Sequence, residues 1–229
     1  MPNLNLVAIA PLLFLSGWAC LLLLADLWIP KNRKAITAWL ALIGLAITCG
    51  LVLPRLGLRE EAFGGMLAID GFAGMLHLIF LGTGGLSVIL ALNFLRHQNI
   101  ERGEFYPLLL FSVVGMMTMG MAQDMIVVLL ALEVLSIPLY VLAGFARARS
   151  DSEESALKYF LLGAFSSAFL VYGVALVYGA TEATGFGAIE AAIIGGGAAT
   201  PLLVAGVGLI LVGLGFKVGI VPFHMWTPD

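Results

Sequence analysis

Long apolar runs constrain the fold of this sequence more than any other feature. Seven runs are long enough to cross the hydrocarbon core of a bilayer, which takes about 20 apolar residues in a helix. None of them alternates polar and apolar residues as a membrane β-strand does. The sequence therefore predicts an all-α, polytopic transmembrane helical bundle with about seven spanning helices: Leu6–Trp28, Ala35–Leu53, Gly71–Leu95, Phe105–Met121, Met125–Ala146, Ala156–Tyr178 and Pro201–Val221.

Composition agrees with a membrane protein and excludes several function classes. The chain is 61% hydrophobic and 11% charged, whereas soluble domains are about 45–50% apolar and about 25% charged. A net charge of −3 with scattered basic residues excludes nucleic-acid binding. The three histidines lie far apart, both cysteines fall in apolar runs, and no Cys-x-x-Cys occurs. We therefore expect no metal, cofactor or catalytic redox site in this chain.

The loops predict how the bundle is oriented in the membrane. Cytoplasmic loops carry an excess of Lys and Arg. The loops after the first, third and fifth runs hold seven such residues, and the opposite side holds two. The first run is too long for a signal-peptide core, so we expect it to remain as a spanning helix. The N-terminus is predicted to lie outside, with Lys31, Arg33, Lys34, Arg96, Arg102, Arg147 and Arg149 inside and Arg55 and Arg59 outside.

Three ionisable residues lie where an apolar helix should have none. They are Glu133 in the fifth run, Lys158 in the sixth and Lys217 in the seventh. A charge at the bilayer centre costs about 2.5–3.5 kcal/mol on insertion scales, and such residues commonly mark ion or proton pathways. We therefore interpret them as proton-carrying groups. A movable contact between Glu133 and Lys217 would act as a protonation switch, because an isolated buried lysine loses its proton.

A proline follows two of these charges at the same spacing. Pro138 lies five residues after Glu133, and Pro222 lies five residues after Lys217. Proline lacks the N–H that would bond the carbonyl four residues back, so each frees one oxygen next to the charged residue. Helix breaks at membrane depth are tolerated where protein or water satisfies the backbone. The sequence predicts helix breaks at Pro138 and Pro222, with the seventh helix broken near Lys217–Pro222, and water access at both sites.

Lys158 and His224 each have two interpretations from the sequence. Lys158 lies four residues after Glu154, so a stabilising pair on the helix surface would also explain it. Against that interpretation, Lys158 shares a polar strip with Tyr159 and Ser166. His224 follows Pro222-Phe223, and histidine titrates near neutral pH. It could pass protons to the lysine of the seventh run or be a hydrogen-bonded structural residue.

Three stretches resemble a known family. They are residues 131–145 (Ala-Leu-Glu-Val-Leu-Ser-Ile-Pro-Leu-Tyr-Val-Leu-Ala-Gly-Phe), 154–169 (Glu-Ser-Ala-Leu-Lys-Tyr-Phe-Leu-Leu-Gly-Ala-Phe-Ser-Ser-Ala-Phe) and 215–229 (Gly-Phe-Lys-Val-Gly-Ile-Val-Pro-Phe-His-Met-Trp-Thr-Pro-Asp). All three resemble subunit N of bacterial NADH:quinone oxidoreductase, respiratory complex I. The mitochondrial counterpart is NADH dehydrogenase subunit 2. The likeness is specific from residue 104 onward.

The resemblance implies an antiporter-like subunit with two inverted five-helix repeats, each containing a broken helix. Residues 1–103 would form an N-terminal three-helix segment, and 104–229 an incomplete first repeat. Glu133, Lys158 and Lys217 match the family's proton-path positions. Family members are about twice as long, so we expect the chain to be part of a longer protein.

The same resemblance implies the partners and the location of the chain. NADH, FMN, iron–sulfur clusters and quinone would be bound by other subunits, and proton transport here would be coupled to quinone reduction elsewhere in the complex. The partners would be other membrane subunits, including antiporter-like neighbours, in the lipid bilayer of a bacterial inner (plasma) membrane.

Three alternatives remain open from the sequence. The nearest is a Mrp-type sodium/proton antiporter subunit built on the same fold, and a weaker one is a membrane subunit of a related hydrogenase. A purely structural subunit, whose buried charges only fix the register of its helices, is the third.

Overall fold

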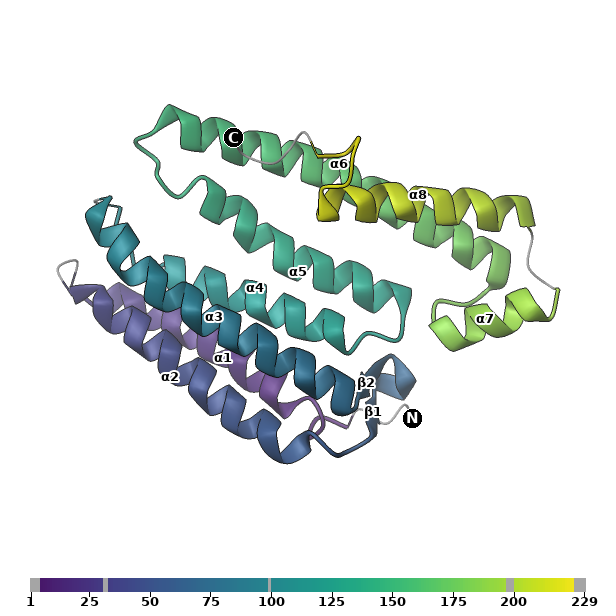
Figure 1. Cartoon of the computed structure of the whole chain (residues 1–229), viewed down its shortest axis with the longest axis horizontal. Helices are drawn as coiled ribbons and strands as arrows, with labels where there is room; N and C mark the ends of the chain where they lie inside the picture. The colour runs from purple at the N-terminus through teal and green to yellow at the C-terminus, as the bar shows by residue number, and fades with distance from the viewer. Residues whose placement is uncertain (1–4, 31–32, 99, 197–199, 225–229) are drawn as a thin grey trace.

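The chain forms a bundle of α-helices with one short β-hairpin (Figure 1). The computed structural model describes residues 5–30, 33–98, 100–196 and 200–224. The helices are α1 (Ala10–Ala25), α2 (Ala35–Val52), α3 (Gly71–His97), α4 (Phe105–Gly120), α5 (Met125–Ala143), α6 (Ser150–Thr181), α7 (Phe186–Ile194) and α8 (Thr200–Val218), and the strands are β1 (Glu60–Ala62) and β2 (Leu67–Ile69).

The helices confirm the predicted membrane bundle. In the described ranges, six of them are long and apolar enough to cross a membrane, and α4 is a shorter apolar helix. With 16 residues, α4 is about 24 Å long, less than the hydrocarbon thickness of about 30 Å. It packs against α1, α3 and α5, and Tyr106, Leu110 and Met117 on it are fully buried. Because protein surrounds α4, it need not match the thickness of the lipid.

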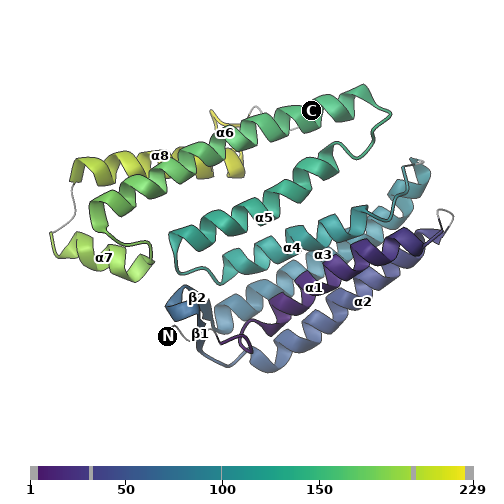
Figure 2. The ribbon, with the colours of Figure 1, turned by 180° about the vertical axis from the view of Figure 1, so that it is seen from behind.

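The β-hairpin, which the sequence analysis did not predict, helps to fix one end of the bundle. β1 and β2 pair antiparallel at the same end as α7, opposite the α5–α6 connection (Figures 1 and 2). The N–H of Ala68 donates to the carbonyl of Met121 at 2.8 Å. From the α6–α7 side, the carbonyl of Thr184 accepts from the N–H of Met125 at 2.9 Å. The short link between α4 and α5 is therefore held from both sides.

Glycines bring α8 against α6. A Cβ built on Gly173 would lie 2.8 Å from the carbonyl oxygen of Gly206, and one on Gly206 would lie 2.9 Å from the carbonyl oxygen of Gly173. A Cβ on Gly213 would lie 2.9 Å from Cβ of Leu170. Small residues at such positions let membrane helices approach backbone to backbone. This close contact sets the position of α8 and of the residues on its last turn.

The predicted break in the last helix is present near Lys217–Pro222, and a glycine causes it. α8 ends at Val218, and Gly219 has a φ of +69°, in the left-handed region. The N–H of Ile220 donates to the carbonyl of Gly215 at 2.9 Å, the long-range bond of a Schellman motif. Pro222 lies in the turn beyond this cap, so it follows the helix end and does not produce it.

The predicted break at Pro138 is not present. α5 continues through Pro138, which is buried, to Ala143. A proline inside a helix removes one backbone hydrogen bond and strains the preceding turn. The remaining bonds of this 19-residue helix and the packing around it keep the helix continuous.

Candidate functional site

One face of α5 carries three polar side chains. Glu133, Ser136 and Tyr140 have the spacing i, i+3 and i+7, which places them on the same side of a helix. Ser136 is 2% exposed and Tyr140 is 7% exposed, and Glu133 is half-buried. The start of the helix is fixed by Asp124, whose Oδ1 accepts from the N–H of Ile126 at 2.8 Å. This polar face is turned toward α6 and α8.

Lys217, on the last turn of α8, reaches that face. Its Nζ donates to Oγ of Ser136 and to the hydroxyl of Tyr140, each at 2.8 Å. The same atom lies 5.3 Å from the centroid of the Tyr140 ring, within cation–π range. The ammonium is thus held between two hydroxyl groups of α5 inside an apolar bundle.

Glu133 is bonded to a serine of α6. Oγ of Ser167 donates to Oε1 of Glu133 at 2.5 Å. A direct ion pair between Glu133 and Lys217, which the sequence analysis predicted as one state of a switch, is not formed in the described structure. The lysine instead contacts Ser136, which lies one turn from the acid. The ion pairs within the described residues are Asp26–Lys34, Arg149–Asp151 and Glu154–Lys158.

Lys158 lies apart from this cluster. Its Nζ is 2.5 Å from Oε1 of Glu154, and the two side chains are 62% and 65% exposed. The three side chains of the predicted polar strip on α6 therefore have different partners. Tyr159 stacks edge-on against Tyr140 with 4.6 Å between ring centroids, and Oγ of Ser166 donates to the carbonyl of Gly213 on α8 at 2.8 Å.

The histidines occupy different surroundings. His224 lies in the exposed turn that follows α8, two residues after Pro222. The ammonium of Lys217 bonds to hydroxyls of α5 on the inner side. His77 is buried in α3, where its Nε2 lies 3.0 Å from the carbonyl oxygen of Met117. The remaining residues of the motif that contains His224, 225–229, lie outside the described residues.

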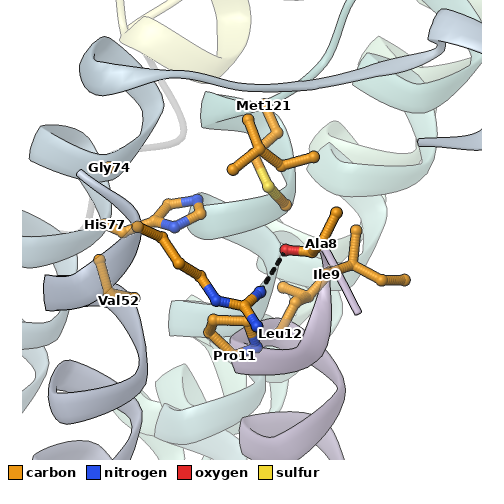
Figure 3. Close-up of a pocket in the computed structure, with 10 residues that line it drawn as sticks. Ala8, Ile9, Pro11, Leu12, Val52, Gly74, His77 and Met121 are labelled. Atoms are coloured by element: carbon orange, nitrogen blue, oxygen red, sulfur yellow. Dashed lines mark hydrogen bonds between the residues drawn. The ribbon is translucent and has the colours of Figure 1, made fainter. Parts of the chain in front are cut away.

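A small cavity lies beside His77 (Figure 3), and no residue of the polar cluster lines it. It has a volume of about 20 Å³, room for about one water molecule, and its walls are mostly apolar. Arg55 lines it and donates to the carbonyl of Ala8 at 2.8 Å and to that of Val7. These bonds tie the segment just before α1 to the segment just after α2. Within the described ranges, no three His, Cys, Asp or Glu side chains are grouped to hold a metal ion.

The hydroxyl groups of the cluster were not predicted. The spacing from Glu133 is a signal that could have identified Ser136 and Tyr140, because positions i+3 and i+7 share its face. Ser167 gives no such signal, since its contact with Glu133 depends on how α6 packs against α5.

Comparison with known proteins places the chain in a family. The sequence profile described as NADH:quinone oxidoreductase/Mrp antiporter, TM matches residues 122–229. NADH-quinone oxidoreductase subunit N of Chloroflexus aggregans is 46% identical over 233 residues, which cover 100% of this chain and 48% of that protein. Subunit N 2 of Roseiflexus castenholzii is 42% identical over 220 residues, covering 93% and 43%. The chain belongs to the NADH:quinone oxidoreductase/Mrp antiporter family of membrane subunits.

A solved structure agrees with this family membership. A chain of respiratory complex I from Thermus thermophilus with bound aureothin matches with a TM-score of 0.78 and 36% identity, covering 96% of this chain and 46% of that one. The chain thus spans about half the length of the relatives that it matches. The family profile covers α5 to α8, and so it contains Glu133, Lys158, Lys217 and His224.

Proposed function

We propose that this chain belongs to a proton-translocating membrane subunit of NADH:quinone oxidoreductase. Protons would pass through Glu133, Lys158, Lys217 and His224 while quinone is reduced elsewhere in the complex. The observation that carries the proposal is the cluster in which Lys217 of α8 is bonded to Ser136 and Tyr140 of α5, on the face that also holds Glu133.

The hydroxyl partners suit groups that gain and lose protons. A serine or tyrosine hydroxyl accepts a hydrogen bond from a lysine ammonium and can donate one to the neutral amine. Ser136 and Tyr140 can therefore satisfy Lys217 in both of its protonation states. The hydroxyl of Ser167 likewise donates to the carboxylate of Glu133 and can accept from the carboxylic acid. Neither half-buried group is left without a partner when a proton moves.

The subunit's surroundings follow from the proposed complex. NADH, FMN, iron–sulfur clusters and quinone would be held by partner subunits, and antiporter-like subunits would flank this chain in a bacterial inner membrane. The N-terminus would lie outside, because the basic loops cluster on the other side. We propose residues 1–103 and 104–229 as the two segments of the chain. α4, the first helix of the second segment, packs against α1 and α3 of the first segment and against α5 of its own.

Two other functions remain as rivals. The family profile covers Mrp antiporters as well as NADH:quinone oxidoreductases, and a sodium/proton antiporter subunit would use a similar fold. The relatives that are 46% and 42% identical are both named subunit N, which favours the oxidoreductase. A purely structural subunit would need the buried charges only to fix helix register, and the hydroxyl partners then have no role in proton transfer.

Substitutions of the two charged residues of the cluster test the proposal. Glu133→Ala and Lys217→Ala should each lower coupled NADH–quinone turnover and proton pumping in membrane vesicles while the complex still assembles. Glu190→Ala, which removes an exposed carboxylate of α7, is the matched control and should leave both rates unchanged. Normal pumping in both site variants would refute the assigned roles.

A further inference from the structure

An open hollow lies between α5 and α6 at the end where their connecting loop runs. It has a volume of about 420 Å³. Arg147 of the loop and Glu153 of the first turn of α6 line it, and both side chains are exposed. Apolar side chains that are themselves partly exposed, including Phe160, line the rest of it. Charged groups at the mouth of a hollow of this size favour the entry of water from the loop side.

Tyr140, which is only 7% exposed, lines this hollow and also contacts the site lysine. Its side chain lines the hollow, and its hydroxyl accepts from Nζ of Lys217 at 2.8 Å. Among the described residues that line the hollow, it is the one bonded to Lys217. Ser136, the other hydroxyl partner of the lysine, does not line the hollow.

The tyrosine is held in this position by its neighbours. The Tyr159 ring stacks edge-on against it, and the Phe160 ring lies 5.9 Å away between centroids. Gly163 faces the hydroxyl so closely that a Cβ there would overlap the oxygen. Only a residue without a side chain at 163 leaves the hydroxyl room beside Lys217.

We propose that Tyr140 is the relay through which protons pass between the loop-side hollow and Lys217, an inference that rests on the proposed function. When Lys217 is a neutral amine, the Tyr140 hydroxyl donates to it. The O–H bond of Tyr140 breaks as a new N–H bond forms on Lys217, and the phenol oxygen takes a proton from a hydronium ion in the hollow. One proton moves inward, water is left behind, and the tyrosine ends as it began.

Tyr140→Phe tests the relay in the assembled complex in membrane vesicles. The variant keeps the ring and removes only the oxygen. We expect pumping to fall about tenfold, because a positioned acid–base group contributes about 10²–10⁴-fold to a proton transfer and water can replace part of that. Tyr172→Phe makes the same change at an exposed position of α6 and should pump normally. Normal pumping in Tyr140→Phe would overturn the relay.

Ser136→Ala distinguishes a relay role of Tyr140 from a role in which Tyr140 only positions Lys217. Both variants remove one hydroxyl partner of Lys217, but only Tyr140 adjoins the hollow. The relay predicts a clearly smaller loss in Ser136→Ala and a larger solvent deuterium isotope effect on coupled turnover in Tyr140→Phe. Equal losses and equal isotope effects would show that Tyr140 only positions the lysine. Lys217→Ala reports on the proposed function itself, because normal pumping there would refute the function whatever Tyr140 does.

A glycine variant supplies an independent check. Gly163→Ala should push the Tyr140 hydroxyl away from Lys217 and lower pumping, although the tyrosine is retained. In Tyr140→Phe the oxygen is already absent, so adding Gly163→Ala should cause little further loss. Losses that multiply in the double variant would contradict the inference.

Discussion

The position of the site lysine depends on the glycine contacts between α8 and α6, and two matched substitutions on α8 test the contact at Gly213. Gly213 packs against α6, where an added Cβ would lie 2.9 Å from Cβ of Leu170 and 3.1 Å from the carbonyl oxygen of Ser166. Gly208, on the same helix, has nothing within 4 Å of an added Cβ. Gly213→Ala and Gly208→Ala therefore add the same methyl group, one against a neighbouring helix and one into open space.

The expected difference follows from these distances. Ordinary contacts begin at 3.4 Å, so α8 must move away from α6 by about half an ångström to accept the methyl group that Gly213→Ala adds. Overpacking of this kind costs about 1–3 kcal/mol. Replacing glycine by alanine in a helix contributes about 1 kcal/mol of stability. We expect Gly208→Ala to be neutral or slightly stabilising and Gly213→Ala to be less stable than it by about 1–3 kcal/mol.

The same movement should affect the site. Gly213 lies one turn before Lys217, whose two hydrogen bonds of 2.8 Å reach across to α5. Reacting groups displaced by about an ångström can lose about 10²-fold in rate, so pumping should fall in Gly213→Ala and not in Gly208→Ala. Unfolding in mixed micelles of increasing SDS content, followed by circular dichroism, measures the stability. Equal stability and equal pumping in the two variants would refute the packing argument.

Two further predictions concern the ion pairs. Lys34→Met should destabilise the protein by about 3 kcal/mol, because it leaves the carboxylate of Asp26, which is 5% exposed, without its cation. The double variant Asp26→Leu, Lys34→Met removes both charges and should recover most of that loss. The same SDS titration measures both, and a double variant as unstable as the single one would contradict the argument. Lys158→Ala should change stability by less than about 0.5 kcal/mol, since its pair with Glu154 is exposed, and a larger loss by the same measurement would mean that the pair is structural.

The helical architecture was predictable because lipid imposes a simple rule on sequence. A spanning helix must be apolar over about 20 residues, so the runs and the helices agree closely. The end of α8 was predicted at the right place for the wrong reason. Proline stood out in the sequence, whereas the cap at Gly219 depends on a left-handed φ. Pro138 gave the same signal, yet α5 passes through it because a single lost bond does not end a packed helix.

The site was only half predictable. Glu133 and Lys217 stood out because charges are costly in lipid. Their bonding partners depend on how α5, α6 and α8 pack, and that packing is set by glycine contacts between residues far apart in the sequence, such as Gly173 and Gly206. The hairpin β1–β2 was missed because strands of three residues are too short to show a period.

Lys217→Arg tests most directly whether Lys217 is retained in the bundle in order to carry protons. Arginine keeps the positive charge and can still donate to the hydroxyls of α5, but its guanidinium does not release a proton in a protein. Proton pumping by the assembled complex in vesicles is the measurement. The account predicts that pumping is lost although the complex assembles normally. Full pumping in Lys217→Arg would contradict it, because a fixed charge would then be enough.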